Sequence, residues 1–192
     1  MKKQTNRLFV IIGICLLVVA ALAMIVWQWG IQASKQEASK YVQTIRTLIP
    51  TPQNAAVEER RDNTMPILSV EGKSFVGILE MPKFGSALPV CADWGEVSRY
   101  PCRLSGSVYD RTMQIGATSQ DGQYDFYREI SVGDLVSFTD MEGNRFSYEV
   151  TDIRYESHAD QSTLRQKDAA LTIFIKNIYS FEYILIFCDT LS

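Results

Sequence analysis

Apolar residues are most concentrated near the start of the chain, where residues 8–27 contain no charged side chain. At about 1.5 Å per residue, a helix of this length spans about 30 Å, the hydrocarbon thickness of a bilayer. Three basic residues precede it, so the positive-inside rule predicts a cytoplasmic N-terminus and an extracellular remainder: Lys2, Lys3 and Arg7. The alternative is a cleaved signal peptide, whose apolar core is ordinarily only about 7–15 residues long. The pattern favours an uncleaved single-pass anchor in the cell membrane.

An amphipathic pattern follows the anchor. Ser34 and Glu37 have the spacing of a capping box, which predicts that a new helix begins there. Apolar side chains then recur at helical spacing on one face: Ala38, Tyr41, Val42, Ile45, Leu48 and Ile49. Pro50 and Pro52 predict the end of this helix. It either covers the following domain or extends the anchor as a stalk, and the polar stretch 51–65 is predicted to be a linker along the domain surface.

The rest of the chain has the pattern of short strands. Residues 67–81 predict a short strand, a Glu-Gly-Lys turn and a longer strand. Residues 133–150 predict a hairpin, because Phe146, Tyr148 and Val150 alternate with polar residues and therefore share one buried face.

The alternation of the hairpin changes after Thr151, where Ile153 and Tyr155 become the apolar positions. This shift predicts a β-bulge near Thr151–Asp152. Two continuous apolar runs, 169–175 and 183–188, end the chain and are typical of strands buried on both faces. Many short strands separated by turn signals predict an all-β barrel or sandwich.

Composition narrows the functional classes. The net charge is −3 at pH 7, so no broad basic field points to nucleic acid as a partner. The single histidine and the cysteine spacing do not fit a metal site, and no metal or other cofactor is expected. Cys15 lies in the anchor, whereas Cys91, Cys102 and Cys188 lie beyond it. Buried thiols are the favoured interpretation, and a Cys91–Cys102 disulfide stays open for an exported protein.

Three segments resemble the sortase family in their order and spacing, most closely its class B-like branch. FVGILEMPKFGSALPV resembles the opening strands, YPCRLSGSV the segment before the histidine strand, and ISVGDLVSFTDMEGNRFSYEVTDI the following hairpin. The resemblance implies a closed eight-stranded β-barrel with short helices over residues 66–192. Before it come a cytoplasmic segment (1–7), a transmembrane anchor (8–27), and a stalk with an amphipathic helix and linker (28–65).

The resemblance also implies where catalytic residues should lie. Sortases cleave a sorting motif with a cysteine thiolate and pass the acyl group to an amine; a histidine exchanges the proton and an arginine supplies charge-assisted hydrogen bonds. The histidine follows a Met-x-Ile-Ala-Gly-His strand, and MQIGATS places Thr118 at that position. The cysteine ends a Thr-Leu-x-Thr-Cys strand, and TIFIK places Lys176 there. The arginine position on the last strand falls on Phe187.

None of these three side chains can supply the family's chemistry. The sequence therefore predicts a catalytically degenerate sortase-like protein of a Gram-positive cell envelope. Its cleft, with Thr118, Ser119 and Lys176, is predicted to bind an extended peptide, a surface protein or a partner sortase. One alternative is an active cysteine transpeptidase whose catalytic residues have moved to Cys188 and His158. A second alternative is a purely structural envelope module.

Overall fold

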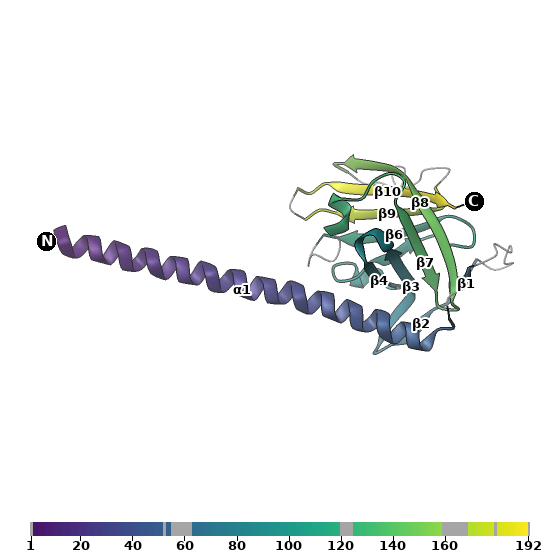
Figure 1. Ribbon diagram of the computed structural model, residues 1–192, viewed down its shortest axis with the longest axis horizontal. Helices are drawn as coiled ribbons and strands as arrows, with labels where there is room; N and C mark the ends of the chain where they lie inside the picture. Colours follow the sequence, from purple (N-terminus) through teal and green to yellow (C-terminus); the bar gives the residue numbers. More distant parts are fainter. Residues whose placement is uncertain are drawn as a thin grey trace.

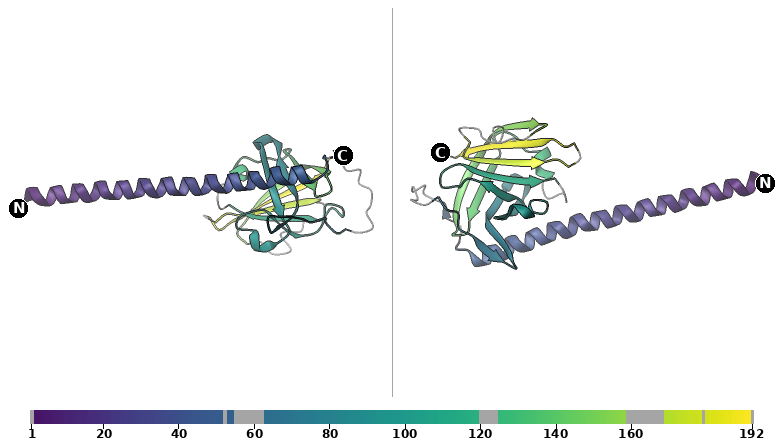
Figure 2. Two further views of the ribbon diagram at one scale, coloured as in Figure 1. Left: turned by 90° about the horizontal axis from the view of Figure 1, so that it is seen from below. Right: turned by 180° about the vertical axis from the view of Figure 1, so that it is seen from behind.

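A long helix and a strand-rich domain make up the described part of the computed structural model, which is residues 2–51, 53–54, 63–119, 125–158, 169–178 and 180–191. The helix, α1 (Lys2–Leu48), projects far beyond the domain, and only its C-terminal turns lie against strands (Figures 1 and 2). The segments predicted as an anchor and as an amphipathic helix are therefore one continuous helix.

The projecting part of α1 exposes apolar side chains. Within the described residues, Ile11–Leu48 is the one helical stretch that is long and apolar enough to cross a membrane. Large side chains on this part are exposed on every side of the helix, among them Leu17, Val26 and Trp29. Water does not favour such a surface, and a bilayer core would bury it.

Eight strands close into the predicted barrel (Figure 1). They are β3 (Lys73–Met81), β4 (Ser86–Cys91), β5 (Cys102–Ser105), β6 (Met113–Thr118), β7 (Leu135–Asp140), β8 (Asn144–Glu156), β9 (Leu171–Lys176) and β10 (Tyr183–Thr190). The order β8-β10-β9-β6-β5-β4-β3 is closed by β7, which pairs with both β3 and β8. The β4–β5 and β6–β9 pairs are parallel.

Shorter elements surround the barrel. Strand β1 (Gln53–Asn54) pairs with β8, and β2 (Leu68–Val70) pairs with β3. Among the described residues, short 3₁₀ helices connect strands at η1 (Pro82–Phe84), η2 (Trp94–Glu96) and η4 (Asp125–Arg128). The predicted linker thus contains a strand, and Met65 at its end is buried in the barrel core. Residues 52 and 55–62 of that linker lie outside the described residues.

Two apolar clusters hold the helix and the barrel together. The first fills the barrel interior with side chains of seven of the eight barrel strands, β5 excepted; examples are Val76, Ile115, Ile173 and Ile186. The second lies outside the wall, where Tyr41 and Ile45 of α1 pack with Phe75, Cys91 and Cys102. The amphipathic face of α1 therefore covers the barrel, while the preceding turns extend away from it.

The predicted capping box is wrong. Ser34 and Glu37 lie inside α1, because the anchor already supplies the turns that a new helix would have to begin. Glu37 instead accepts a hydrogen bond of 2.7 Å from the Tyr100 hydroxyl. Leu48, expected on the buried face, is 58% exposed. At 3.6 residues per turn, it lies about 60° around the helix from the fully buried Ile45, at the rim of the apolar stripe.

The β7–β8 hairpin and its bulge are confirmed. Phe146, Tyr148 and Val150 are buried, and the β8–β10 register skips one residue, because Cys188 faces Val150 whereas Phe187 faces Asp152. Tyr155 differs from the prediction, since it is 64% exposed. Among the described strands, β8 pairs only with β10 beyond Val150, so no neighbour covers Tyr155 there.

Candidate functional site

Three strands end together at one edge of the barrel. Thr118, the last residue of β6, is the direct partner of Lys176, the last residue of β9. Lys176 is in turn the partner of Tyr183, the first residue of β10. Directly paired residues of neighbouring strands point to the same face of a sheet. Thr118, Lys176 and Tyr183, which we call the strand-end site, therefore share one face.

Phe187 does not belong to this site, contrary to the prediction. Its partner on β9 is Thr172, four residues before Lys176. At about 3.3 Å per residue, this places Phe187 about 13 Å along the sheet. It is fully buried in an outer cluster with Phe174 and Leu185. The error is one of register, because the turn between β9 and β10 sets the pairing. The signal that was available is Tyr183 itself, the polar-tipped residue at which the last apolar run begins.

The side chains at and beside the strand-end site differ in their solvent exposure and in their contacts. Lys176 is exposed, and its ammonium lies 5.9 Å from the centre of the Tyr183 ring, within the range of a cation–π contact. The Thr118 hydroxyl is half-buried and lies 3.4 Å from the carbonyl oxygen of Ser98. Ser119 is buried, and its hydroxyl accepts a hydrogen bond of 3.1 Å from the Ile178 amide. Ser119 therefore joins β6 to the β9–β10 turn, and Lys176 is the accessible side chain of the set.

The connection between β4 and β5 covers the strands that lead to this site. Trp94 of η2 packs on Phe174 of β9, with ring centres 5.8 Å apart. Gly116, the β6 partner of Phe174, makes room for both rings, because a Cβ built there would lie 2.4 Å from atoms of each. Trp94 remains 40% exposed, and its partner Phe174 precedes Lys176 by two residues on the same face of β9, so the Trp94 ring is part of the surface that leads to Lys176. No local pattern in the sequence predicts this position for Trp94, because the contact depends on the closure of the barrel.

Three contacts hold this covering segment in place. The Asp93 carboxylate accepts a hydrogen bond of 2.8 Å from the Gly95 amide and caps η2. Glu96 pairs with Lys73 of β3 at 2.7 Å. The Tyr100 hydroxyl bonds to α1, as described above, and burial together with this bond raises the pKa of Tyr100 above its ordinary range. The covering segment is thus tied both to the barrel and to α1.

Cys188 and His158 are not brought together. Cys188 lies in the barrel interior opposite Val150, and burial raises the pKa of its thiol well above the ordinary value. His158 is exposed and lies two residues beyond Glu156, at the other end of β8. From Val150 to Glu156 the strand spans about 20 Å. The geometry does not support a relocated catalytic pair. No group of metal-ligating side chains occurs among the described residues either.

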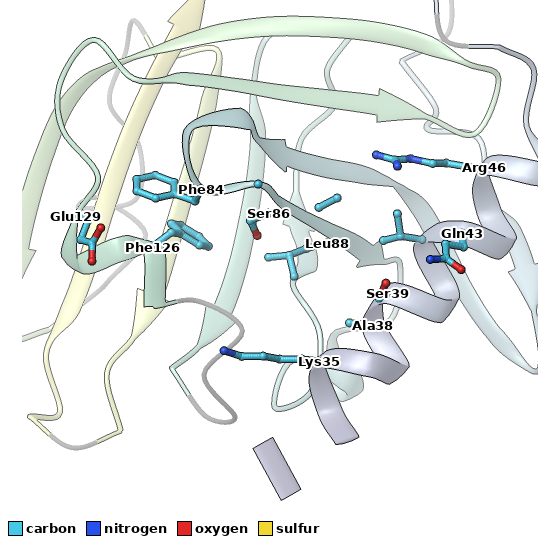
Figure 3. Close-up of a pocket in the computed structure, with 13 residues that line it drawn as sticks. Lys35, Ala38, Ser39, Gln43, Arg46, Phe84, Ser86, Leu88, Phe126 and Glu129 are labelled. Carbon is cyan, nitrogen blue, oxygen red and sulfur yellow. The ribbon is translucent and has the colours of Figure 1, made fainter. Parts of the chain in front are cut away.

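A hollow lies between α1 and the barrel (Figure 3), and its lining includes none of the three strand-end residues. Its volume is ≈ 580 Å³. Polar side chains of α1 line one wall, among them Lys35 and Arg46, and Phe84, Leu88 and Phe126 line the other. Sequence reasoning missed this hollow, because the docking of α1 creates it.

Comparison with solved structures finds this architecture in sortases. Sortase A from Corynebacterium diphtheriae aligns with a TM-score of 0.52 and 12% identity, over 90% of this chain and 94% of that one. For sortase C-1 from Actinomyces oris the TM-score is 0.53, with 13% identity over 84% of this chain and 99% of that one. For a class D sortase transpeptidase from Clostridium perfringens the TM-score is 0.50, with 14% identity over 62% and 79%.

In sequence, no protein-family model and no curated protein matches the chain. The structural likeness, at these identities, concerns the fold. The chain has the closed-barrel fold of the sortases, joined to an N-terminal apolar helix long enough to cross a membrane.

Proposed function

We propose that this chain is a membrane-anchored, sortase-like binding protein without transpeptidase activity. The basic residues before the anchor support an orientation with the N-terminus in the cytoplasm and the barrel outside the cell membrane. The sequence segments quoted above support a class B-like origin in a Gram-positive envelope. The bound partner is an extended peptide, either from a surface protein or from a partner sortase.

The observation that carries the proposal is the composition of the strand-end site. In the family frame, Thr118 and Lys176 occupy the histidine and cysteine positions, and they are direct partners across β6 and β9. A threonine hydroxyl does not exchange a proton near neutral pH, and a lysine that attacked a peptide would form a stable amide. Tyr183, which completes the site in place of Phe187, supplies no positive charge. The site therefore lacks the nucleophile, the base and the guanidinium.

The same site keeps features that suit binding. Lys176 presents a cation at the surface, and a cation attracts a carboxylate. The centre of the Tyr183 ring lies 5.9 Å from the Lys176 ammonium. Two exposed aromatic side chains come from neighbouring segments: Trp94, which packs on Phe174 of β9 and is 40% exposed, and Phe181 of the β9–β10 turn, which is 72% exposed. Phe181 also has a φ of 58°, the left-handed region that a bulky residue rarely adopts. Aromatic walls beside one cation favour an apolar peptide segment that carries a carboxylate.

The proposal is tested by peptide binding to the full chain in detergent micelles. Fluorescent sorting-motif peptides with a free or an amidated C-terminus are titrated by fluorescence polarisation. The free carboxylate should bind more tightly, and Lys176→Glu should weaken binding about tenfold or more. Lys40→Glu is the matched control, because Lys40 is an exposed lysine on α1, paired with Glu71 away from the site. If Lys176→Glu left peptide binding unchanged, the peptide would bind elsewhere than at the strand-end site. If the wild type bound no peptide, the result would favour a purely structural module.

The assignment of the two positions has an independent test. In Thr118→His combined with Lys176→Cys, the new imidazole and thiol would be direct cross-strand partners. A neighbouring imidazolium stabilises a thiolate, so the thiol pKa should fall relative to Lys176→Cys alone. The pH dependence of iodoacetamide labelling measures this pKa. Equal pKa values in the two variants would contradict the assignment.

A further inference from the structure

Cys91 and Cys102 form the shortest strand pairing in the barrel wall. They are the single pair of partners between β4 and β5, whereas every other strand pairing of the closed barrel has at least three. The Cys91 amide also donates a hydrogen bond of 2.8 Å to the Pro101 carbonyl. The ends of the 92–101 segment are therefore held together mainly at these two cysteines.

The two side chains lie on the same side of the wall, because Cys91 and Cys102 are direct partners across β4 and β5 and belong to one apolar cluster. Both thiols are free in this structure. The Cys102 thiol donates to the carbonyl oxygen of Tyr100, with the sulfur 3.4 Å from the oxygen. Adjacent strands lie about 4.8 Å apart, which falls within the Cα separation of about 4.4–6.8 Å that a disulfide requires.

We propose that Cys91 and Cys102 are a disulfide site, and that this structure represents the reduced form of the pair. The proposal rests on the exported location of the barrel, since disulfides persist in oxidising compartments. Each thiol loses its proton, one sulfur–sulfur bond forms, and the two electrons pass to the disulfide of an exported thiol oxidoreductase, which becomes a dithiol. The bond closes the loop that carries Trp94 onto Phe174 of β9, two residues before Lys176.

Burial determines when this reaction occurs. Cys91 and Cys102 are 1% and 0% exposed, and Tyr41 of α1 and Phe75 belong to the same packed cluster. An oxidoreductase cannot reach them in the folded state, so the exchange precedes the docking of α1 on the barrel. The reduced, folded protein should therefore resist oxidised glutathione and become oxidised when it refolds from urea in its presence.

The test is the thiol count of the full chain in membranes from cells that express it. Cells are quenched in acid, the protein is denatured and alkylated with N-ethylmaleimide without reductant, and its intact mass is measured. Two adducts are expected, at Cys15 and Cys188, and four after prior reduction. Four adducts without reductant would overturn the proposal.

Two single variants make the count specific. Cys91→Ser should leave three reactive thiols, because Cys102 has lost its partner, whereas Cys188→Ser should leave one and keep the disulfide. The oxidised protein should also unfold at a temperature on the order of 10 °C higher than the reduced protein, since the bond lowers the conformational entropy of the unfolded chain. Equal unfolding temperatures would contradict a stabilising disulfide. Peptide binding enters neither measurement, so this proposal and the proposed function can fail separately.

Discussion

Replacing Ile45 by alanine tests whether α1 is part of the folded domain. Ile45 is fully buried between α1 and the barrel wall, in the cluster that contains Tyr41 and Phe75. The substitution removes three carbons, worth about 0.8 kcal/mol each on transfer from water, and leaves a cavity beneath the helix. Buried Ile→Ala changes of this kind lower the free energy of unfolding by about 2–5 kcal/mol. For a domain of this size, the melting temperature should fall by roughly 10 °C.

The assay is thermal unfolding of the full chain in detergent, followed by near-ultraviolet circular dichroism, which reports on the packing of the aromatic rings. Leu48→Ala is the matched control, because Leu48 lies on the same helix and is 58% exposed. Its melting temperature should stay within about 2 °C of the wild type, since exposed substitutions change stability by about 0.5 kcal/mol or less. Equal changes in melting temperature for the two substitutions would refute the packing of α1 on the barrel. The helix would then be a stalk that does not contribute to the folded domain.

Two further substitutions test the packing beside the site and an ion pair at the other end of β10. Gly116→Ala should lower the free energy of unfolding by about 1–3 kcal/mol, measured in urea, because its Cβ would overlap two rings, whereas Gly95→Ala, with its nearest contact at 3.3 Å, should have a smaller effect. Asp189 has a pKa below its ordinary value, chiefly because it accepts from the Thr190 amide and also because Arg111 pairs with it. The ionised Asp189 carboxylate therefore contributes to the free energy of unfolding above about pH 4, and this contribution is lost as the pH falls through the lowered pKa. Asp189→Asn should cost less than about 1 kcal/mol at pH 7 and have no effect near pH 2; an equal loss at both pH values would contradict this assignment.

Local patterns predicted the strands well. Alternation placed Phe146, Tyr148 and Val150 on one buried face, and the phase shift located the bulge at Thr151. These features depend on residues close in the chain, so the sequence contains enough information to define them. The capping box at Ser34 failed because the same local signal occurs within a helix that has already begun.

The site was predicted less completely, because it depends on pairing between distant strands. The segment motifs identified Thr118 and Lys176, which the β6–β9 ladder brings together. The turn between β9 and β10 sets the next register, so the place of Tyr183 at the start of the last apolar run is not enough to identify it, rather than Phe187, as the partner of Lys176. Trp94 was missed for a related reason, since it reaches the site only after the barrel has closed.

The central claim, that the fold is retained without its chemistry, is tested most directly by a transpeptidation assay. The full chain in detergent is incubated with a library of sorting-motif peptides and an amine, and products are followed by mass spectrometry. The account predicts neither cleavage nor transfer, and no covalent peptide adduct on the protein. Turnover that disappears in Cys188→Ala would contradict it.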